Sequence, residues 1–160
     1  MLRASSKSRQ FLMDSLNLSR TLDRLSHAEQ RSMLPRLRES VLFVSRASAG
    51  DAEAVAGMIE QEREHVAWLV EMMADLGESP TPCTADVHTT SMHYVELTCV
   101  MPRVIQSKRN SIAFYEQNAA AVSTSAEASA LVARITERHK SHLAQLNEMT
   151  GSLESASTDG

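Results

Sequence analysis

A heptad pattern over residues 55–76 constrains the fold of this chain more than any other feature of its sequence. The members of the pattern are spaced alternately three and four residues apart, and they are Val55, Met58, Glu62, His65, Leu69, Met72 and Leu76. This alternation places all seven side chains on one face of an α-helix. Such a face is stable when it packs against other helices, so the pattern predicts a helical bundle.

The composition agrees with an all-α fold. Gly and Pro number only five and four, and aromatic residues make up 4% of the chain. The cores of β-sheet proteins are richer in aromatic and β-branched residues. A length of 160 residues suits one domain with its own core. We therefore predict a single antiparallel four-helix bundle.

Apolar periodicity and turn residues divide the chain into segments. The predicted bundle helices cover residues 30–48, 51–76, 89–122 and 125–149. The linker over 78–87 spans at most ~35 Å when extended, which is about the length of a bundle. The second and third helices therefore either run parallel, with a crossover between them, or follow a short up-down connection.

The two ends of the chain are predicted to lie outside the bundle. Residues 1–28 form an N-terminal extension, partly disordered or containing a short amphipathic helix over 11–26. Residues 29–150 form the bundle, and residues 151–160 form a disordered tail.

Two pairs of ionisable residues interrupt otherwise apolar stripes. Glu62 and His65 lie in the middle of the stripe described above, and His139 and His142 lie between Ile135 and Leu146 in the fourth helix. Burying such groups without partners costs several kcal/mol. Residues three apart on a helix point the same way, so each pair can converge on one centre. A metal ion satisfies carboxylate and imidazole together, and a hydrogen-bonded polar cluster is the alternative.

The segments around these pairs resemble known proteins. QEREHVAWLVEMMADLGESP, residues 61–80, and ITERHKSHLAQL, residues 135–146, are similar to the second and fourth helices of ferritin-like proteins of the rubrerythrin and bacterioferritin kind. The resemblance covers about residues 30–150. It implies a di-iron centre, bound by carboxylates and histidines, that oxidises iron, reduces peroxide or activates oxygen. If the protein is an enzyme, the resemblance implies an iron-dependent oxidase or a peroxidase-like oxidoreductase.

The match to the helix motifs of that family is incomplete on the second pair. Glu62 and His65 match the Glu-x-x-His of the second helix, and His142 matches the histidine of the fourth. His139 stands where the family has a glutamate. The first and third helices of the family each add one further glutamate.

Neither of those further glutamates has a clear counterpart. Glu39 lies at the right height on the predicted first helix, but about two residues out of phase with the apolar stripe. The third helix has no acidic residue between Glu96 and Glu116, and Gln106, Lys108 and Arg109 occupy that region.

Two functions follow, and the sequence leaves both open. In the first, Glu62, His65, His139 and His142 bind metal, with Glu39 and Gln106 as weaker candidates. The metal is di-iron or a mononuclear ion of iron, zinc, manganese or copper, and the protein acts in iron handling or oxidative-stress defence. In the second, Lys108 or Arg109 pairs with Glu62, and the bundle is a metal-free scaffold or interaction protein.

The partners and the location of the protein are predicted from the resemblance to ferritin-like proteins and from the composition. We expect a homodimer, since ferritin-like bundles commonly associate. The net charge of −4 gives no indication of nucleic-acid binding, and no apolar run is long enough to span a membrane. Cys83 and Cys99 are expected to be reduced thiols in a cytoplasm. His88, His93 and Glu96 are expected to form an exposed polar helix start rather than a second site.

Overall fold

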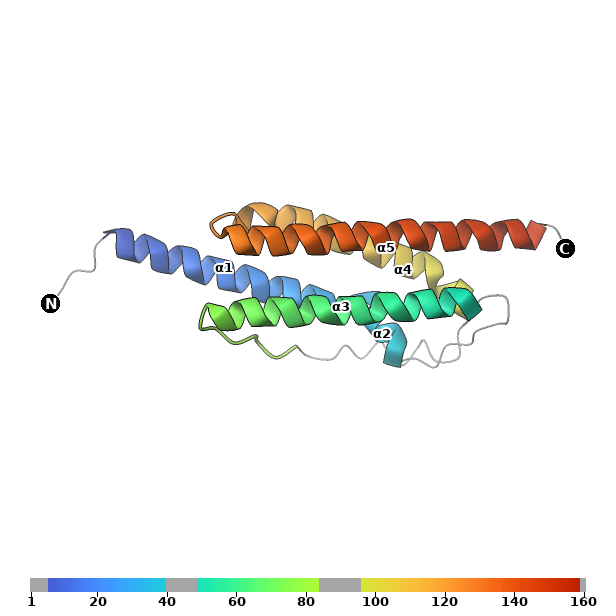
Figure 1. The fold of residues 1–160 in the computed structure, drawn as a ribbon, viewed down its shortest axis with the longest axis horizontal. Coiled ribbons are helices and arrows are strands. Elements are labelled where there is room, and N and C mark those ends of the chain that lie inside the picture. The colour runs from blue at the N-terminus through green and yellow to red at the C-terminus, as the bar shows by residue number, and fades with distance from the viewer. Residues whose placement is uncertain (1–5, 40–48, 84–95, 159–160) are drawn as a thin grey trace.

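The structure, a computed structural model, describes residues 6–39, 49–83 and 96–158. Four long helices lie side by side in it (Figure 1). The helices are α1 (Ser6–Gln30), the short α2 (Met33–Glu39), α3 (Ala49–Asp75), α4 (Leu97–Asn118), the 3₁₀ turn η3 (Ala119–Val122) and α5 (Ala126–Thr158). This all-α arrangement confirms the predicted four-helix bundle.

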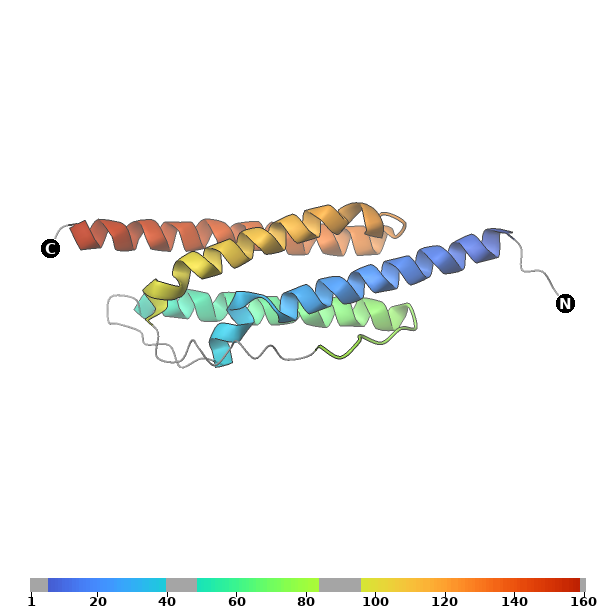
Figure 2. The same ribbon diagram turned by 180° about the vertical axis from the view of Figure 1, so that it is seen from behind.

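The helix directions identify the connection in the middle of the chain. Helices α1 and α5 run one way along the bundle, and α3 and α4 run the other way (Figures 1 and 2). Helix α1 packs mainly against α3, and α4 mainly against α5. Because α3 and α4 are parallel, the end of α3 and the start of α4 lie at opposite ends of the bundle. This is the crossover alternative, which is typical of ferritin-like topologies.

Buried side chains form two apolar clusters. One contains Leu34, Leu37, Val55, Met58, Val100, Val104 and Leu146, among others. The other contains Leu18, Leu22, Leu25, Leu69, Met73, Tyr115 and Ile135, among others. Buried ionisable residues lie between the two clusters on each long helix, so the bundle has a polar layer at mid-height.

The first bundle helix differs from the prediction. The segment treated as an N-terminal extension forms α1, and the segment predicted as the first bundle helix, 30–48, supplies only the short α2 among its described residues. Residues 40–48 of that segment lie outside the described part of the chain. The physical reason is packing: Leu18, Leu22 and Leu25 are buried against α3 and α4, and this contact stabilises a helix whose first turns are polar.

The other helix ends also shift. Helix α5 continues to Thr158, where a disordered tail was predicted from residue 151. That segment contains no proline, and its glycine and serines cost a helix only about 1 kcal/mol each or less. Helix α4 is described from Leu97 on, and the predicted start at residue 89 lies outside the described residues. The predicted helix over 51–76 matches α3 closely.

Gly77 ends α3 in a left-handed conformation, with φ +76°. The amide of Gly77 donates to the carbonyl of Ala74, and the amide of Glu78 donates to that of Met73, the paired bonds of a Schellman motif. A Cβ at Gly77 would meet no atom within 4 Å, so the cost of a side chain is conformational.

Replacing Gly77 by alanine is therefore expected to lower the free energy of unfolding by about 1–2 kcal/mol. The matched control is Gly57→Ala inside α3, where a Cβ also meets nothing within 4 Å. That change is expected to raise stability by about 0.5–1 kcal/mol, because glycine is a poor residue for a helix interior. Urea denaturation of the two variants tests the difference, and equal effects would contradict it.

Candidate metal centre

Six ionisable side chains from all four long helices meet in the polar layer. Helix α1 contributes Glu29, α3 contributes Glu62 and His65, α4 contributes Lys108, and α5 contributes His139 and His142. Each of the six is at most 2% exposed. Their positions follow from heptad spacing, since each continues the buried apolar stripe of its own helix.

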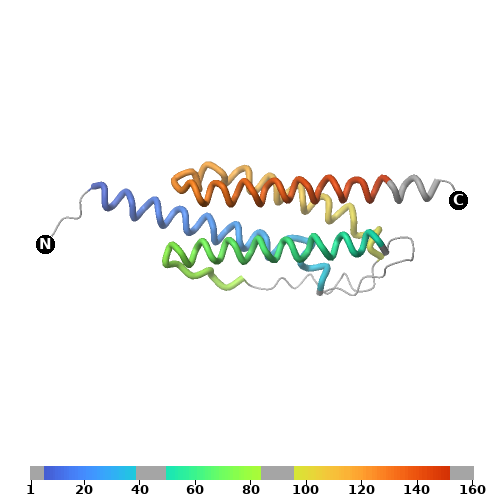
Figure 3. Tube along the Cα trace, in the orientation of Figure 1, coloured from blue at the N-terminus to red at the C-terminus, as the bar shows by residue number. Residues whose placement is uncertain are grey.

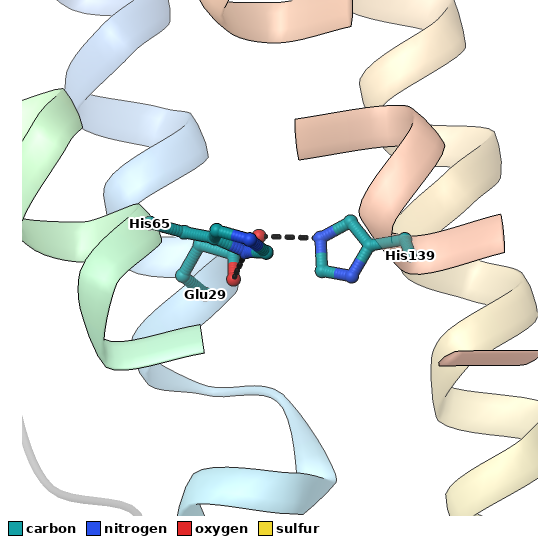
Figure 4. A group of neighbouring side chains, drawn as sticks. All are labelled: Glu29, His65 and His139. Carbon is teal, nitrogen blue, oxygen red and sulfur yellow. Dashed lines mark hydrogen bonds and ion pairs between the residues drawn. The ribbon is translucent and has the colours of Figure 1, made fainter. Parts of the chain in front are cut away.

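The carboxylate of Glu29 lies between two imidazoles (Figure 4). Its Oε1 is 2.7 Å from Nε2 of His139, and its Oε2 is 3.2 Å from Nδ1 of His65. Burial opposes ionisation of Glu29, but the hydrogen bonds from His139 and His65 outweigh it and hold the pKa of Glu29 below its ordinary value. Glu29 is therefore a carboxylate at neutral pH.

The carboxylate of Glu62 has a different set of partners. Its Oε1 is bonded to Nζ of Lys108, and its Oε2 accepts a hydrogen bond of 2.5 Å from the hydroxyl of Ser32. The Lys108 ammonium also lies 3.0 Å from Nδ1 of His139. Burial lowers the pKa of Lys108 to about 8, and the charge of Glu29 acts in the opposite direction. Contact with the Glu62 carboxylate further favours the charged form, so Lys108 is an ammonium at pH 7.

These contacts assign the histidine tautomers. Nδ1 of His139 accepts from Lys108, so the proton of that ring is on Nε2 and points at Glu29. Nε2 of His142 donates to Oε1 of Gln61 at 2.7 Å. This leaves three buried polar atoms without a hydrogen-bond partner among the described residues, namely Nε2 of His65, Nδ1 of His142 and the Tyr115 hydroxyl.

Burial sets the remaining ionisation states. It lowers the pKa of His142 to about 3, and the charges of Lys108 and His139 act in the same direction. Burial also lowers the pKa of His139, against the opposing effect of Glu29. Burial, followed by the charge of Glu29, raises the pKa of the Tyr115 hydroxyl well above its ordinary value. At pH 7 His139 and His142 are neutral, and Tyr115 is a protonated phenol.

Two overlapping groups of side chains in the described part of the chain have metal-ligand geometry. Glu29, His65 and His139 form one group, and Glu62, His139 and His142 form the other. Within each group, one ligand atom from every residue lies within 4.8 Å of the others. The second group is already in contact with a cation, since Lys108 is bonded to Glu62 and to His139.

The structure brings together the four main candidates from the sequence, Glu62, His65, His139 and His142. It does not include Gln106, which is exposed and hydrogen-bonded to Asn110. Glu39 is the last residue of α2, and its side chain lies outside the described part of the chain. His88 and His93 also lie outside it.

Two residues of the centre, Glu29 and Ser32, are not among the candidates from the sequence. The signal for Glu29 was present, because it follows Leu18, Leu22 and Leu25 at spacings of four, three and four. The polar, basic start of its segment favours an N-terminal extension instead. Of the two cations considered, Lys108 is the one that points inward, and Arg109 is exposed.

Comparisons with known proteins agree with the fold. No family model and no curated protein matches the sequence. Among solved structures, a ferritin-like di-iron carboxylate protein from Bacillus anthracis str. Ames matches with a TM-score of 0.69 and 18% identity, over 86% of this chain and 97% of that one. The chain therefore has the predicted ferritin-like fold.

The residues present do not fit a ferritin-like di-iron centre. Such a centre takes one glutamate from each of two helices and a Glu-x-x-His pair from each of the other two. In this chain Glu29, Glu62 and His65 match that scheme, but Lys108 and His139 stand in the positions of the other two glutamates. Two carboxylates and an ammonium cannot hold two divalent ions close together.

The first group fits one ion. It offers one carboxylate and two imidazoles whose ligand atoms lie within 4.8 Å of one another, so these three residues could hold a single ion. Separately, none of the helices in the described residues has the length and apolar character needed to cross a membrane.

Proposed function

We propose that this protein binds one divalent transition-metal ion through Glu29, His65 and His139. The observation that carries the proposal is the unequal neutralisation of two buried carboxylates. Glu62 is bonded to Lys108, whereas Glu29 is equally buried and has no lysine or arginine ion-paired to it among the described residues. Among these residues, Glu29 is stabilised only by hydrogen bonds from two imidazoles, and a carboxylate with two imidazoles is a set of ligands that a transition-metal ion binds.

The donor set narrows the choice of ion. Two imidazoles and one carboxylate suit Fe(II), and they also suit zinc and manganese. When Fe(II) is bound, this kind of site supplies an open coordination position for oxygen or peroxide. We therefore propose a role in iron handling or oxidative-stress defence, which the ferritin-like fold also supports.

Lys108 stands in the place of a second cation in this proposal. Its ammonium balances Glu62, and its contact with Nδ1 of His139 ties it to the first group. An ion on Nε2 of His139 would leave the ring proton on Nδ1, where it faces the Lys108 ammonium. The contact between Lys108 and His139 would then have to break, while the Lys108–Glu62 ion pair stays. Protons compete with the ion for the imidazoles, so ion binding should strengthen as the pH rises.

Tyr115 adds a proton donor beside the group. Its ring contacts the ring of His139 with a centroid distance of 5.2 Å, and its buried hydroxyl lies near Glu29 without a hydrogen bond of good geometry. Because its pKa is raised, the phenol stays protonated next to Glu29. It can therefore donate a hydrogen bond to an oxygen atom bound at the group and remain a phenol.

Metal analysis of untagged protein tests the proposal. After chelator treatment and separate addition of Fe(II), Zn(II) or Mn(II), elemental analysis is expected to find one ion per chain. Glu29→Gln and His65→Gln are each expected to weaken binding by about 10–100-fold or more, a typical loss even for supporting groups of metal sites. The matched control is Glu64→Gln on the surface of α3, which is expected to bind normally. Equal retention by Glu29→Gln and Glu64→Gln would contradict the proposal.

A second candidate function is a metal-free bundle that works by association with partners. The observation that favours it is the completeness of the hydrogen bonds around the carboxylates. Lys108 and Ser32 donate hydrogen bonds to Glu62. His65 and His139 donate hydrogen bonds to Glu29, so both carboxylates have donors without an ion. On this alternative the chelated protein retains no added metal, and its thermal stability is the same with and without divalent ions.

A further inference from the structure

The N-terminal turns of α1 extend beyond the rest of the bundle. In Figures 1–3 they project past the end formed by the C-terminus of α3 and the N-terminus of α5. This projecting segment, residues 6–13, exposes large apolar side chains, with Phe11 74% and Leu12 59% exposed. A helix of two or three turns has little stability in water by itself, and contiguous exposed apolar residues mark interaction surfaces.

The projecting segment continues the packed face of α1. Phe11, Ser15, Leu18, Leu22 and Leu25 are spaced four, three, four and three residues apart. The last three are buried in the bundle, whereas Phe11 lies on the same stripe and is exposed. This face has the pattern of a helix that packs against other helices, but no other helix of the described residues covers it at Phe11.

A groove with a matching character lies between α3 and α5 at the same end of the bundle. Trp68, Met72 and Leu131 contribute apolar surface to it. The guanidinium of Arg134 lies 3.9 Å from the centre of the Trp68 ring and that of Arg138 lies 4.7 Å from it, which holds the half-buried indole in place.

The charges of the groove and of the projecting segment are opposite. Glu71, Asp75 and Glu127 line the groove together with Arg134, while Arg138, which lies over the Trp68 ring, is ion-paired with Glu64. The projecting segment carries Lys7 and Arg9 and no acidic residue. Within the described part of the chain, the three carboxylates that line the groove and these two cations form no ion pair.

We propose that the projecting segment of one copy docks in the α3–α5 groove of a second copy, and that the exchange is reciprocal. Both surfaces lie at one end of the bundle, so a twofold axis at that end presents each segment to the other copy's groove. The segment cannot turn back to its own groove, because α1 is one continuous helix from Ser6 to Gln30. Apolar contact of Phe11 and Leu12 stabilises the dimer, and the opposite charges fix its orientation.

Charge reversal on each surface tests the proposal in the full-length protein. Sedimentation and light scattering are expected to find a dimer at low-micromolar concentration. Variant A, Lys7→Glu with Arg9→Glu, and variant B, Glu71→Lys with Asp75→Lys, should each dimerise about tenfold more weakly or worse, because both contacts become repulsive. An equimolar mixture of A and B should recover the dimer, because both of its contacts are attractive again.

The controls separate this interface from misfolding and from the metal proposal. Circular dichroism should show the same helix content in A, B and the unmodified chain. Glu53→Lys, an exposed reversal near the opposite end of α3, should leave the dimer intact. All measurements are made with chelator, so failure of metal binding does not affect them. A monomeric unmodified chain, or a mixture of A and B that fails to associate, would overturn the proposal.

Discussion

Replacing Lys108 by methionine is expected to lower the free energy of unfolding by about 3–5 kcal/mol. Methionine keeps most of the side-chain volume but removes the cation from Glu62, which is fully buried. The carboxylate then stays in the core with only the Ser32 hydroxyl as a strong donor. Urea denaturation at pH 7.5 in the presence of chelator measures the loss without a contribution from metal.

Two further variants distinguish this cause from a general sensitivity to lysine removal. Lys140→Met removes an exposed lysine on α5 and is expected to leave the urea midpoint nearly unchanged. Lys108→Met combined with Glu62→Leu is expected to recover most of the stability, because an apolar pair replaces a buried ion pair with little loss. If Lys108→Met were as mild as Lys140→Met, the buried ion pair described here would be wrong.

The metal-free protein is expected to lose stability as the pH falls from about 6.5 to 5. Burial lowers the folded-state pKa of His139 and of His142, so both rings stay neutral while the unfolded chain takes up protons below the ordinary histidine value. The unfolded state then binds more protons than the folded state, and stability falls as the pH falls. Each histidine contributes a slope approaching about 1.4 kcal/mol per pH unit.

The shifted pKa values of Glu29 and Lys108 lie outside this window. The pKa of Glu29 is lowered, so its contribution is present at neutral pH and is lost only in the acidic range of carboxylates. The pKa of Lys108, about 8, lies above the window. Urea midpoints are measured from pH 7.5 to 5. Their dependence on pH should be weaker in His142→Gln than in the unmodified chain, and weaker still in the double variant His139→Gln with His142→Gln. Identical profiles for the unmodified chain and the double variant would show that these histidines are not buried and neutral.

Three of the long helices were predicted well from their residues alone. The heptad stripes of α3 and α5 carry two ionisable pairs, and the spacing of three within each pair requires both members to point into the bundle. Glu62, His65, His139 and His142 are accordingly buried together. This prediction succeeded because helix periodicity is a local property that any packed helix must obey.

The identity of the first bundle helix depended on tertiary structure. Residues 6–30 begin with a polar, basic segment, and residues 30–48 contain an apolar stripe of their own, so local patterns favoured the second segment. Residues 6–30 form the bundle helix because they pack against α3 and α4. This packing also places Glu29 between His65 and His139. Contacts between residues more than 30 positions apart cannot be read from periodicity.

The sequence by itself determined an all-α bundle with a buried layer of carboxylate and imidazole, because hydrophobic spacing and the cost of burying charge are encoded residue by residue. Only the tertiary structure decided how that layer is neutralised. Sequence left Lys108 and Arg109 as equal candidates, and the rotation of α4 against α5 turned Lys108 inward to Glu62 and left Arg109 exposed. The two residues are neighbours in the sequence, and a rotation of 100° per residue places neighbours on different faces of a helix, so only one of them can pair with Glu62.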